Sequence, residues 1–361
     1  MDRAVSDAKG PVNLALQGGG AHGAFTWGVL DRLLEEKDLE VEGISATSAG
    51  AMNAAAFKHG WVLGGADGAK EALEAFWMGL AGLTGPLGHA IVDWLRVVSP
   101  PPGITARALA LSPAVQATEA VTRVLSPYQF NPVNYHPLRA IVESLLDLDA
   151  VCAAQGPKLF ICATNVRDGK PRVFQGKEIS TDAILASACL PTLYQAIEID
   201  DPRTKRREAY WDGGYMGNPA LFPLFYKTAS PDIIIVHINP LYREELPRTS
   251  VEIASRINEI SFNASLLREL RNVDFVNRLI ERGIIADGAM KRSFIHSVSD
   301  DDLMNQLGMA TKMAISRSLL LQLRDAGRAT MDRFLREHGQ NIGHRSSVDI
   351  RAMFLSEGAE V

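Results

Sequence analysis

Two short apolar runs near the start of the chain are each followed by a turn of small residues and then by a helical pattern. The first run, VNLALQ (12–17), precedes a glycine turn and the segment AFTWGVLDRLLEE. The second, VEGIS (41–45), precedes AGAMNAAAFKHG. Such alternation is typical of parallel βαβ units with helices on both faces of the sheet. We therefore expect an α/β protein, a three-layer sandwich with a mainly parallel central sheet.

The rest of the chain supplies further strand and helix patterns. KLFICATNV and KPRVFQ flank RDG (167–169), and IEID and EAYWD flank a polar turn, which predicts two hairpins. IIIVHI (233–238) predicts a buried strand. The pattern is helical after about Val251, with one strand at SFIHSV (293–298), and the last 15 or so residues are expected to be loosely held. We predict a main domain over 10–240, with a helical insert at about 79–150. A mainly helical C-terminal extension over 241–361 would pack on or beside it.

Composition excludes several classes of partner. A net charge of −5 with 22% charged residues gives no global field toward nucleic acid, so no nucleic-acid partner is expected. The three cysteines lack metal-ligand spacing, so we expect reduced thiols and no metal or cofactor. The chain starts without a signal-peptide pattern and has no run of about 18 apolar residues. We expect a cytoplasmic protein, with peripheral membrane contact left open and the oligomeric state unknown.

A serine at position 48 stands among unusually small residues, in VEGISATSAGAMNAAA (41–56). The pattern x-S-x-G between a strand and a helix is the setting of a nucleophile elbow. Small neighbours let the chain turn sharply, and the N-terminus of the next helix favours developing negative charge. The same position suits an N-cap of an alanine-rich helix, so both interpretations of Ser48 stay open. Ser45 is a weaker candidate because no glycine lies two residues beyond it.

The segment LALQGGGAHGAF (14–25) places four glycines between a strand and a helix. Gly18, Gly20 and Gly23 match the G-x-G-x-x-G dinucleotide fingerprint, but no acidic residue ends the second strand, as that fingerprint requires. A P-loop is excluded because no Gly-Lys-Ser/Thr follows. Consecutive glycines are costly in a merely structural turn, and they let backbone N–H groups turn inward. An oxyanion hole is therefore the preferred interpretation of Gly18, Gly19 and Gly20.

An aspartate at position 212 ends an apolar strand in AYWDGGYMGNP (209–219). When it is considered by itself, an Asp-Gly-Gly segment most often marks a turn. A serine nucleophile, however, needs a group that accepts its proton. None of the eight histidines stands in a small-residue turn like that of the serine, and His237 and His296 lie inside apolar strands. A direct Ser–Asp dyad with Asp212 therefore competes with a triad that contains histidine.

Taken together, the glycine turn, the elbow and the late Asp-Gly-Gly resemble the patatin-like phospholipase family. The resemblance covers roughly residues 10 to 240 and includes ASACLP (186–191) and GNP (217–219). It implies a patatin-like α/β fold in which Ser48 is the nucleophile and Asp212 its dyad partner. Amides around Gly18, Gly19 and Gly20 would form the oxyanion hole. It also implies cleavage of ester bonds in phospholipids or related acyl lipids, with no metal in the dyad.

The chain departs from the pattern of the family at two positions. Ala46 replaces the first glycine of the elbow, and His22 stands where the glycine loop usually carries arginine or lysine. A neutral histidine would weaken the positive charge there. Four alternatives therefore remain: an acyltransferase on the same dyad, a transacylase related to malonyl transferases with a histidine base, a nicotinamide oxidoreductase, and a catalytically weak lipid-binding homologue.

Two further segments have open roles. The insert is rich in apolar residues, which have three alternative roles: a cap over the dyad, a face that contacts a membrane, or packing against the core. These residues are Leu80, Leu83, Leu87, Ile91, Val92, Trp94, Leu95, Val97 and Val98. A basic turn shortly before Asp212 would be a solvated hairpin turn or would meet lipid phosphates: Arg203, Lys205, Arg206 and Arg207.

Overall fold

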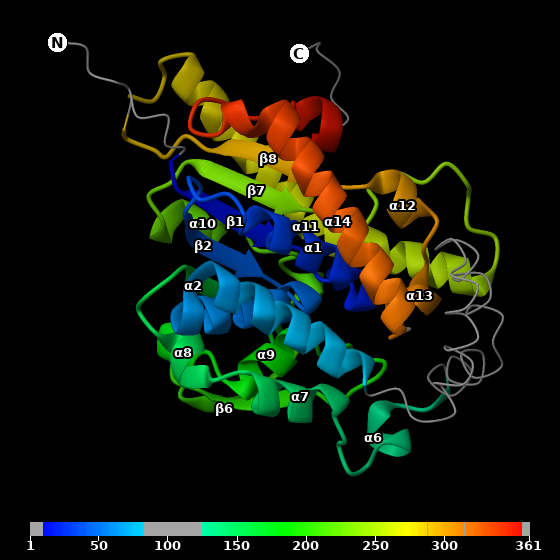
Figure 1. Ribbon diagram of the computed structural model, residues 1–361. Coiled ribbons are helices and arrows are strands. Elements are labelled where there is room, and N and C mark those ends of the chain that lie inside the picture. The colour runs from blue at the N-terminus through cyan, green and yellow to red at the C-terminus, as the bar shows by residue number, and fades with distance from the viewer. Residues whose placement is uncertain (1–9, 83–123, 287, 314, 356–361) are drawn as a thin grey trace.

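The computed structural model describes residues 10–82, 124–286, 288–313 and 315–355 (Figure 1). Within these residues one sheet has eight strands: β1 (Val12–Leu16), β2 (Val41–Ala46), β3 (Lys158–Asn165), β4 (Pro171–Gln175), β5 (Ile197–Asp201), β6 (Arg206–Asp212), β7 (Asp232–Val236) and β8 (Phe294–Val298). The strand order is β5-β6-β3-β2-β1-β7-β8, and β4 pairs with β3. The five strands β3-β2-β1-β7-β8 run parallel, whereas β4, β5 and β6 enter through antiparallel pairs.

Several strand predictions are confirmed by this pairing. The β1–β2 pair is parallel, as expected for a βαβ unit. The two predicted hairpins are β3–β4 and β5–β6, both antiparallel. The buried strand predicted at 233–238 is β7, and the strand predicted at 293–298 is β8.

Helices cover both faces of the sheet, as Figure 1 shows. Their bounds are α1 (Gly23–Leu33), α2 (Ala49–Ala81), α6 (Pro127–Phe130), α7 (Pro137–Leu145), α8 (Leu148–Cys152), α9 (Thr181–Ser187), α10 (Phe222–Lys227), α11 (Ser250–Glu281), α12 (Asp301–Asn305), α13 (Met309–Met313) and α14 (Arg317–His338). Short turns are η1 (Gly20–His22), η2 (Gly176–Glu178), η3 (Gly213–Tyr215), η4 (Gly339–Asn341) and the π-helical η5 (Arg351–Leu355).

The alternation of side chains along the strands separates two cores. Leu14 and Leu16 of β1 belong to a buried cluster that includes residues of α1, α2, α9 and α14. Ala15, between them, belongs to a second cluster with residues of α10 and α11. Successive strand side chains point to opposite faces, so each helical layer has its own apolar core. The expected three-layer α/β architecture is confirmed.

Helix α2 is longer than predicted. The sequence pattern indicates a helix to about residue 60, and the structure continues it to Ala81 with a kink at Gly64 and Gly65. The second half of α2 brings Phe76, Trp77 and Leu80 into the buried core. Of the apolar insert residues named above, Leu80 is described, whereas those from Leu83 to Val98 lie outside the described residues. The described part of the insert forms α6, α7 and α8.

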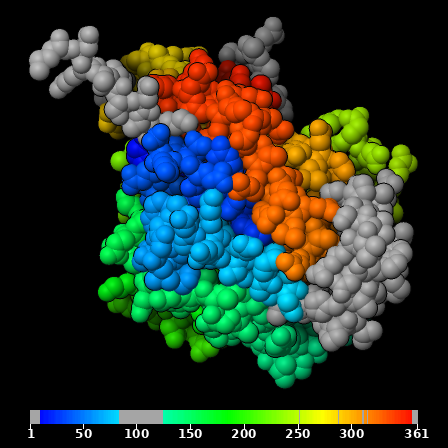
Figure 2. Space-filling view, in the orientation of Figure 1, coloured from blue at the N-terminus to red at the C-terminus, as the bar shows by residue number. Residues whose placement is uncertain are grey.

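Residues after 240 contribute to the same sheet and the same core. β8 pairs with β7, and α14 packs along α1. Arg328 of α14 forms ion pairs with Asp31 of α1 and with Glu35, which follows that helix. Figure 2 shows α14 crossing this face of the molecule beside α1 and α2. The expectation of a loosely held C-terminus is wrong as far as residue 355, because Phe354 and Leu355 are buried in the second core.

Candidate active site

Ser48 occupies a strained turn between β2 and α2. Its φ of 55° and ψ of −123° fall in a region that residues with a side chain seldom adopt. Such strain persists only where the surrounding structure imposes it, and it is concentrated at functional sites. Ser48 is the N-cap of α2 by position, but its side chain makes no capping hydrogen bond. The capping role that the sequence also allowed is therefore not realised, and the hydroxyl is left for another partner.

Neighbouring side chains fix the turn. The Ser48 N–H donates to Ser187 Oγ at 2.9 Å, and the Ser187 hydroxyl donates to the Cys162 carbonyl at 2.6 Å. The Thr47 hydroxyl donates to the Gly217 carbonyl at 2.6 Å. Three segments that are distant in the sequence thus meet at the elbow, and the strained backbone of Ser48 is held on both sides.

Strand register brings Asp212 to the same place. Ala46, at the end of β2, pairs with Ile161 of β3, and Ala163 of β3 pairs with Asp212, at the end of β6. β2 and β6 are therefore both neighbours of β3, and their ends lie two residues apart along it. This register explains how residues 164 positions apart in the sequence (212 − 48) become adjacent.

The Asp212 carboxyl is fully buried, and one of its two oxygens has a hydrogen-bond partner among the described residues. Its Oδ1 accepts the Gly214 N–H at 2.7 Å, whereas Oδ2 has no hydrogen-bond partner within the described residues. Burial raises the pKa of Asp212 to about 7, against the opposing effects of the Gly214 N–H and the Ser48 side chain. The serine side chain therefore lies close enough to act on the carboxyl, although no hydrogen bond of normal geometry joins them. Oδ1 of Asp212 therefore holds the turn at Gly214, while Oδ2 is buried without a hydrogen-bond partner among the described residues.

The glycine loop lies directly against the elbow. A Cβ atom on Gly18 would lie 2.5 Å from the Ser48 Cβ, so only glycine fits there. The Gly18 N–H is already donated to Asn218 Oδ1 at 2.6 Å. In the described parts of the chain, the N–H groups of Gly19 and Gly20 have no acceptor. Of the three predicted oxyanion amides, two are therefore available.

An apolar cavity of about 120 Å³ opens at Ser48. It is lined by side chains of α2, α7, the segment after α9 and the segment around α13, including Met52, Phe76, Trp77, Leu80, Leu138, Leu190, Leu193, Tyr194, Lys312 and Ile315. Among the described residues of this lining, Lys312 is the one that carries a charge. Most of the described lining residues are apolar, and the Ser48 side chain lies at the edge of this apolar surface.

No histidine of the described residues contacts Ser48 through a hydrogen bond, an ion pair or a ring contact. The His22 ring forms a hydrogen bond with the Thr311 hydroxyl, and the His59 ring accepts one from the Asp147 N–H. The His136 ring stacks on Tyr194. The His296 ring forms a hydrogen bond with the Asp232 carboxyl. The ring nitrogens of His237 have no partner there, and burial lowers its pKa to about 4. His338 contacts Phe334. His89 lies outside the described residues. The Ser48 side chain acts instead on the Asp212 carboxyl, whose pKa it lowers against the larger effect of burial.

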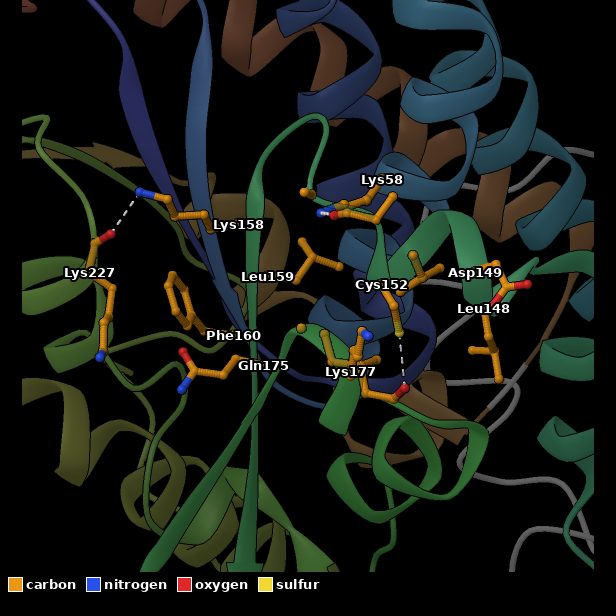
Figure 3. Close-up of a pocket in the computed structure, with 15 residues that line it drawn as sticks. Lys58, Leu148, Asp149, Cys152, Lys158, Leu159, Phe160, Gln175, Lys177 and Lys227 are labelled. Atoms are coloured by element: carbon orange, nitrogen blue, oxygen red, sulfur yellow. Dashed lines mark hydrogen bonds between the residues drawn. The ribbon is translucent and has the colours of Figure 1, made fainter.

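A larger pocket lies at the opposite ends of the strands (Figure 3). Its volume is about 900 Å³, and four lysines line it: Lys58, Lys158, Lys177 and Lys227. Lys58 donates to the Ala153 carbonyl at 2.6 Å, and Lys158 pairs with Glu42 at 3.2 Å. Neither Ser48 nor Asp212 lines this pocket, so size alone does not locate the candidate site.

The basic turn and the cysteines, which the sequence analysis also singled out, lie in ordinary structural environments. In the basic turn between β5 and β6, Arg203 pairs with Glu178 and Arg207 with Glu198. Cys162 and Cys189 are buried, and none of the three cysteines forms a disulfide. Within the described residues, no group of three metal-binding side chains is close enough to hold an ion. There, too, no helix has the length and apolarity needed to cross a membrane.

Three residues of the site were missed by the sequence analysis. Ser187 lies within ASACLP, where only the small size of the residues was noted. Asn239 follows β7 and donates to the Gly18 carbonyl at 2.7 Å. Lys312 lies on α13, about 290 residues after the glycine loop. Their roles depend on long-range contacts, and a lysine in MATKM has no local pattern that would mark it.

Comparisons with known proteins identify the family of the chain. The family model described as patatin-like phospholipase matches residues 14–225. Among solved structures, VipD from Legionella pneumophila matches with a TM-score of 0.40 and 13% identity, covering 91% of this chain and 67% of that one. No curated protein matches significantly. Since the family model spans more than half of the sequence, the chain belongs to the patatin-like phospholipase family.

Proposed function

We propose that this protein is a serine acyl hydrolase that cleaves ester bonds of phospholipids or related lipids through a Ser48–Asp212 dyad. The observation that carries this proposal is the free, buried Oδ2 of Asp212 beside a serine on a strained turn. A buried acceptor without a partner is costly, which is why structural carboxylates are normally satisfied. If Oδ2 of Asp212 accepts the proton of the serine, its lack of a structural partner has a catalytic reason.

The placement of these groups supports the following mechanism. Asp212 accepts the proton of the Ser48 hydroxyl as its oxygen attacks the ester carbonyl. The N–H groups of Gly19 and Gly20 stabilise the tetrahedral oxyanion, while Gly18 holds the loop against the serine. Collapse of the intermediate breaks the ester C–O bond, and the protonated Asp212 returns its proton to the leaving oxygen, so that the alcohol departs and an acyl-serine remains. Water then gives a proton to the Asp212 carboxylate and attacks the acyl carbonyl. The bond to Ser48 Oγ breaks, Asp212 returns the proton to the serine oxygen, and the fatty acid is released.

The cavity and the family both support a lipid as the substrate. Its lining is almost wholly apolar from Met52 to Leu193, which suits an acyl chain better than a polar acyl group. The α2 helix supplies much of this wall through Phe76, Trp77 and Leu80. The long second half of α2 would thus serve to enclose the chain of the lipid.

Ester turnover by two variants and two matched controls tests the proposal. Ser48→Ala and Asp212→Asn are each expected to lower kcat on a medium-chain ester by about 10⁴-fold or more. Ser45→Ala removes a buried hydroxyl that donates to the Ala220 carbonyl, and Asp200→Asn changes an exposed aspartate on β5. Both controls are expected to keep activity within a few-fold. Full turnover by either dyad variant, with the folded state intact, would reject the dyad.

A further inference from the structure

Lys312 is a buried cation with an unusual set of partners. Its side chain is only 8% exposed, and within the described residues its ammonium donates one hydrogen bond, to Asn239 Oδ1 at 2.8 Å. Of its three N–H donors, two therefore have no acceptor there. None of the described carboxylates lies within ion-pair distance of it. Burying a charge without a direct counter-ion is expensive, so this position calls for a function.

The contact with Asn239 connects Lys312 to the glycine loop. Asn239 Nδ2 donates to the Gly18 carbonyl at 2.7 Å and also approaches Gln17 Oε1 at 3.2 Å. The Gly18 carbonyl belongs to the same peptide group as the Gly19 N–H. Because the two point in opposite directions across a trans peptide, pinning the carbonyl to Asn239 sets the direction of the Gly19 N–H.

The same chain of hydrogen bonds strengthens the Gly19 N–H as a donor. The Lys312 ammonium donates to Oδ1 of Asn239 and so polarises the side-chain amide of Asn239. The Nδ2 group of that amide in turn polarises the Gly18–Gly19 peptide. The backbone of Lys312 also reaches the loop: a Cβ on Gly20, where φ is +59°, would lie 2.3 Å from the Lys312 carbonyl oxygen. α13 therefore contacts the loop through both its backbone and its side chain.

We propose that Lys312 is a positioning residue that orients and polarises the Gly18–Gly19 peptide through Asn239, and so prepares the Gly19 N–H for the ester oxyanion. This inference rests on the proposed acyl hydrolase function and deepens it. It gives the segment after residue 240 a role at the reacting centre, beyond the family match that ends at residue 225. Burial and, after it, the charge of Lys312 lower the pKa of His22, so Lys312 supplies the positive charge near the loop that His22 does not.

The charged surroundings of Lys312 set a pH limit. Burial lowers the pKa of Lys312 to about 8, Glu259 on α11 opposes this and Arg243 adds to it. Glu259 is already paired with Arg243 at 2.7 Å and Arg256 at 3.2 Å, and His22 on η1 is neutral. The relay needs the ammonium form, so it weakens as the pH rises through about 8.

Kinetics of four variants provide the first test. Lys312→Met is expected to lower kcat by about 10- to 100-fold, less than or similar to the loss of one oxyanion donor, with KM within about twofold. Asn239→Leu should have a similar effect, and the double variant should be no worse than either single one. Lys312→Arg should keep most of the activity and lose the decline above pH 8, since arginine stays charged. An unchanged kcat in Lys312→Met, or additive losses in the double variant, would overturn the relay.

A nuclear magnetic resonance experiment tests the relay without requiring turnover. Labelling glycine with both ¹³C′ and ¹⁵N selects Gly-Gly pairs, of which the sequence has four: 18–19, 19–20, 64–65 and 213–214. In the wild-type protein the Gly19 amide should titrate with a midpoint near pH 8, and in Lys312→Arg it should not. A Gly19 signal that is insensitive to pH in this range would contradict the relay. If the signal titrates while the wild type cleaves no ester, the proposed function fails and the relay stands.

Discussion

A Cβ atom on Gly18 would lie 2.5 Å from the Cβ of Ser48, so the turn after β1 and the turn after β2 are in direct contact. The parallel register of the two strands, with Leu16 opposite Ala46, brings both turns to the same edge of the sheet. The amides of the glycine loop and the hydroxyl of the elbow therefore face one reaction volume. This contact makes the glycine loop part of the proposed chemistry.

Substitution of Gly18 tests the contact directly. Gly18→Ala places a methyl group on both the Ser48 Cβ and the Thr47 carbonyl, so loop and elbow must separate. We expect kcat/KM on a medium-chain ester to fall by about 100-fold, because oxyanion donors act only over a short range. Gly64→Ala, where nothing lies within 4 Å of the new methyl group, is the matched control. Equal activity in the two variants would contradict a functional contact.

Ser187 is expected to hold the elbow in its strained conformation. Ser187→Ala leaves the Ser48 N–H without its acceptor and the Cys162 carbonyl without its donor, both in a buried setting. The expected cost in the free energy of unfolding is about 1–3 kcal/mol, together with a loss of kcat. Chemical denaturation and steady-state kinetics measure the two effects. Ser144→Ala, on α7, is the control, and a variant as stable and active as that control would show that Ser187 is dispensable.

The pKa of Asp212 predicts the acid side of the pH profile. The base must be ionised to accept the serine proton, and burial raises the pKa of Asp212 to about 7. The value of kcat/KM should therefore fall tenfold per pH unit below about pH 7. Assays from pH 5 to pH 7.5 measure this limb. A profile that is flat down to pH 5 would mean that a carboxylate with an ordinary pKa, or another base, accepts the proton.

The same shift predicts that Asp212 destabilises the folded protein at neutral pH and above. Since the folded-state pKa of about 7 exceeds the ordinary 3.8, the stabilisation of the protonated form is complete below about pH 4 and is lost as the pH rises through 7. Asparagine cannot ionise and avoids this loss. Asp212→Asn should therefore be more stable than the wild type at pH 8, by up to about 4 kcal/mol from roughly 3 pKa units, and nearly equal at pH 4.

Urea denaturation at pH 4, 6 and 8 measures this difference. Glu269 also has a raised pKa, of about 7, but it is present in both proteins and cancels in the comparison. An Asp212→Asn variant that is less stable than the wild type at pH 8 would show that the ionised carboxylate supports the fold.

Much of the fold could be predicted because it is encoded locally. The two hairpins follow from turn residues between apolar runs, and the parallel β1–β2 pair follows from alternating strand and helix patterns. The kink of α2 could not be predicted, because Gly64 and Gly65 look like a helix end when the packing of the second half is unknown. The burial of Phe354 likewise depends on a core formed by distant segments.

The candidate site divides in the same way. Ser48 and Asp212 stand in small-residue turns after strands, and those patterns are visible in the sequence. Which glycine amides are available depends instead on Asn218, which occupies the Gly18 N–H from 200 residues away. The neutral His22 was expected to leave the loop short of positive charge. The structure places the Lys312 ammonium beside that loop, from a part of the chain where no motif was expected.

The most direct test of the central claim is labelling with a serine-reactive fluorophosphonate, with the modified residue located by mass spectrometry. The wild-type protein should carry one label, on Ser48, and Asp212→Asn should be labelled far more slowly. Labelling of a different residue, or an equal rate of Ser48 labelling in Asp212→Asn, would contradict the proposed dyad.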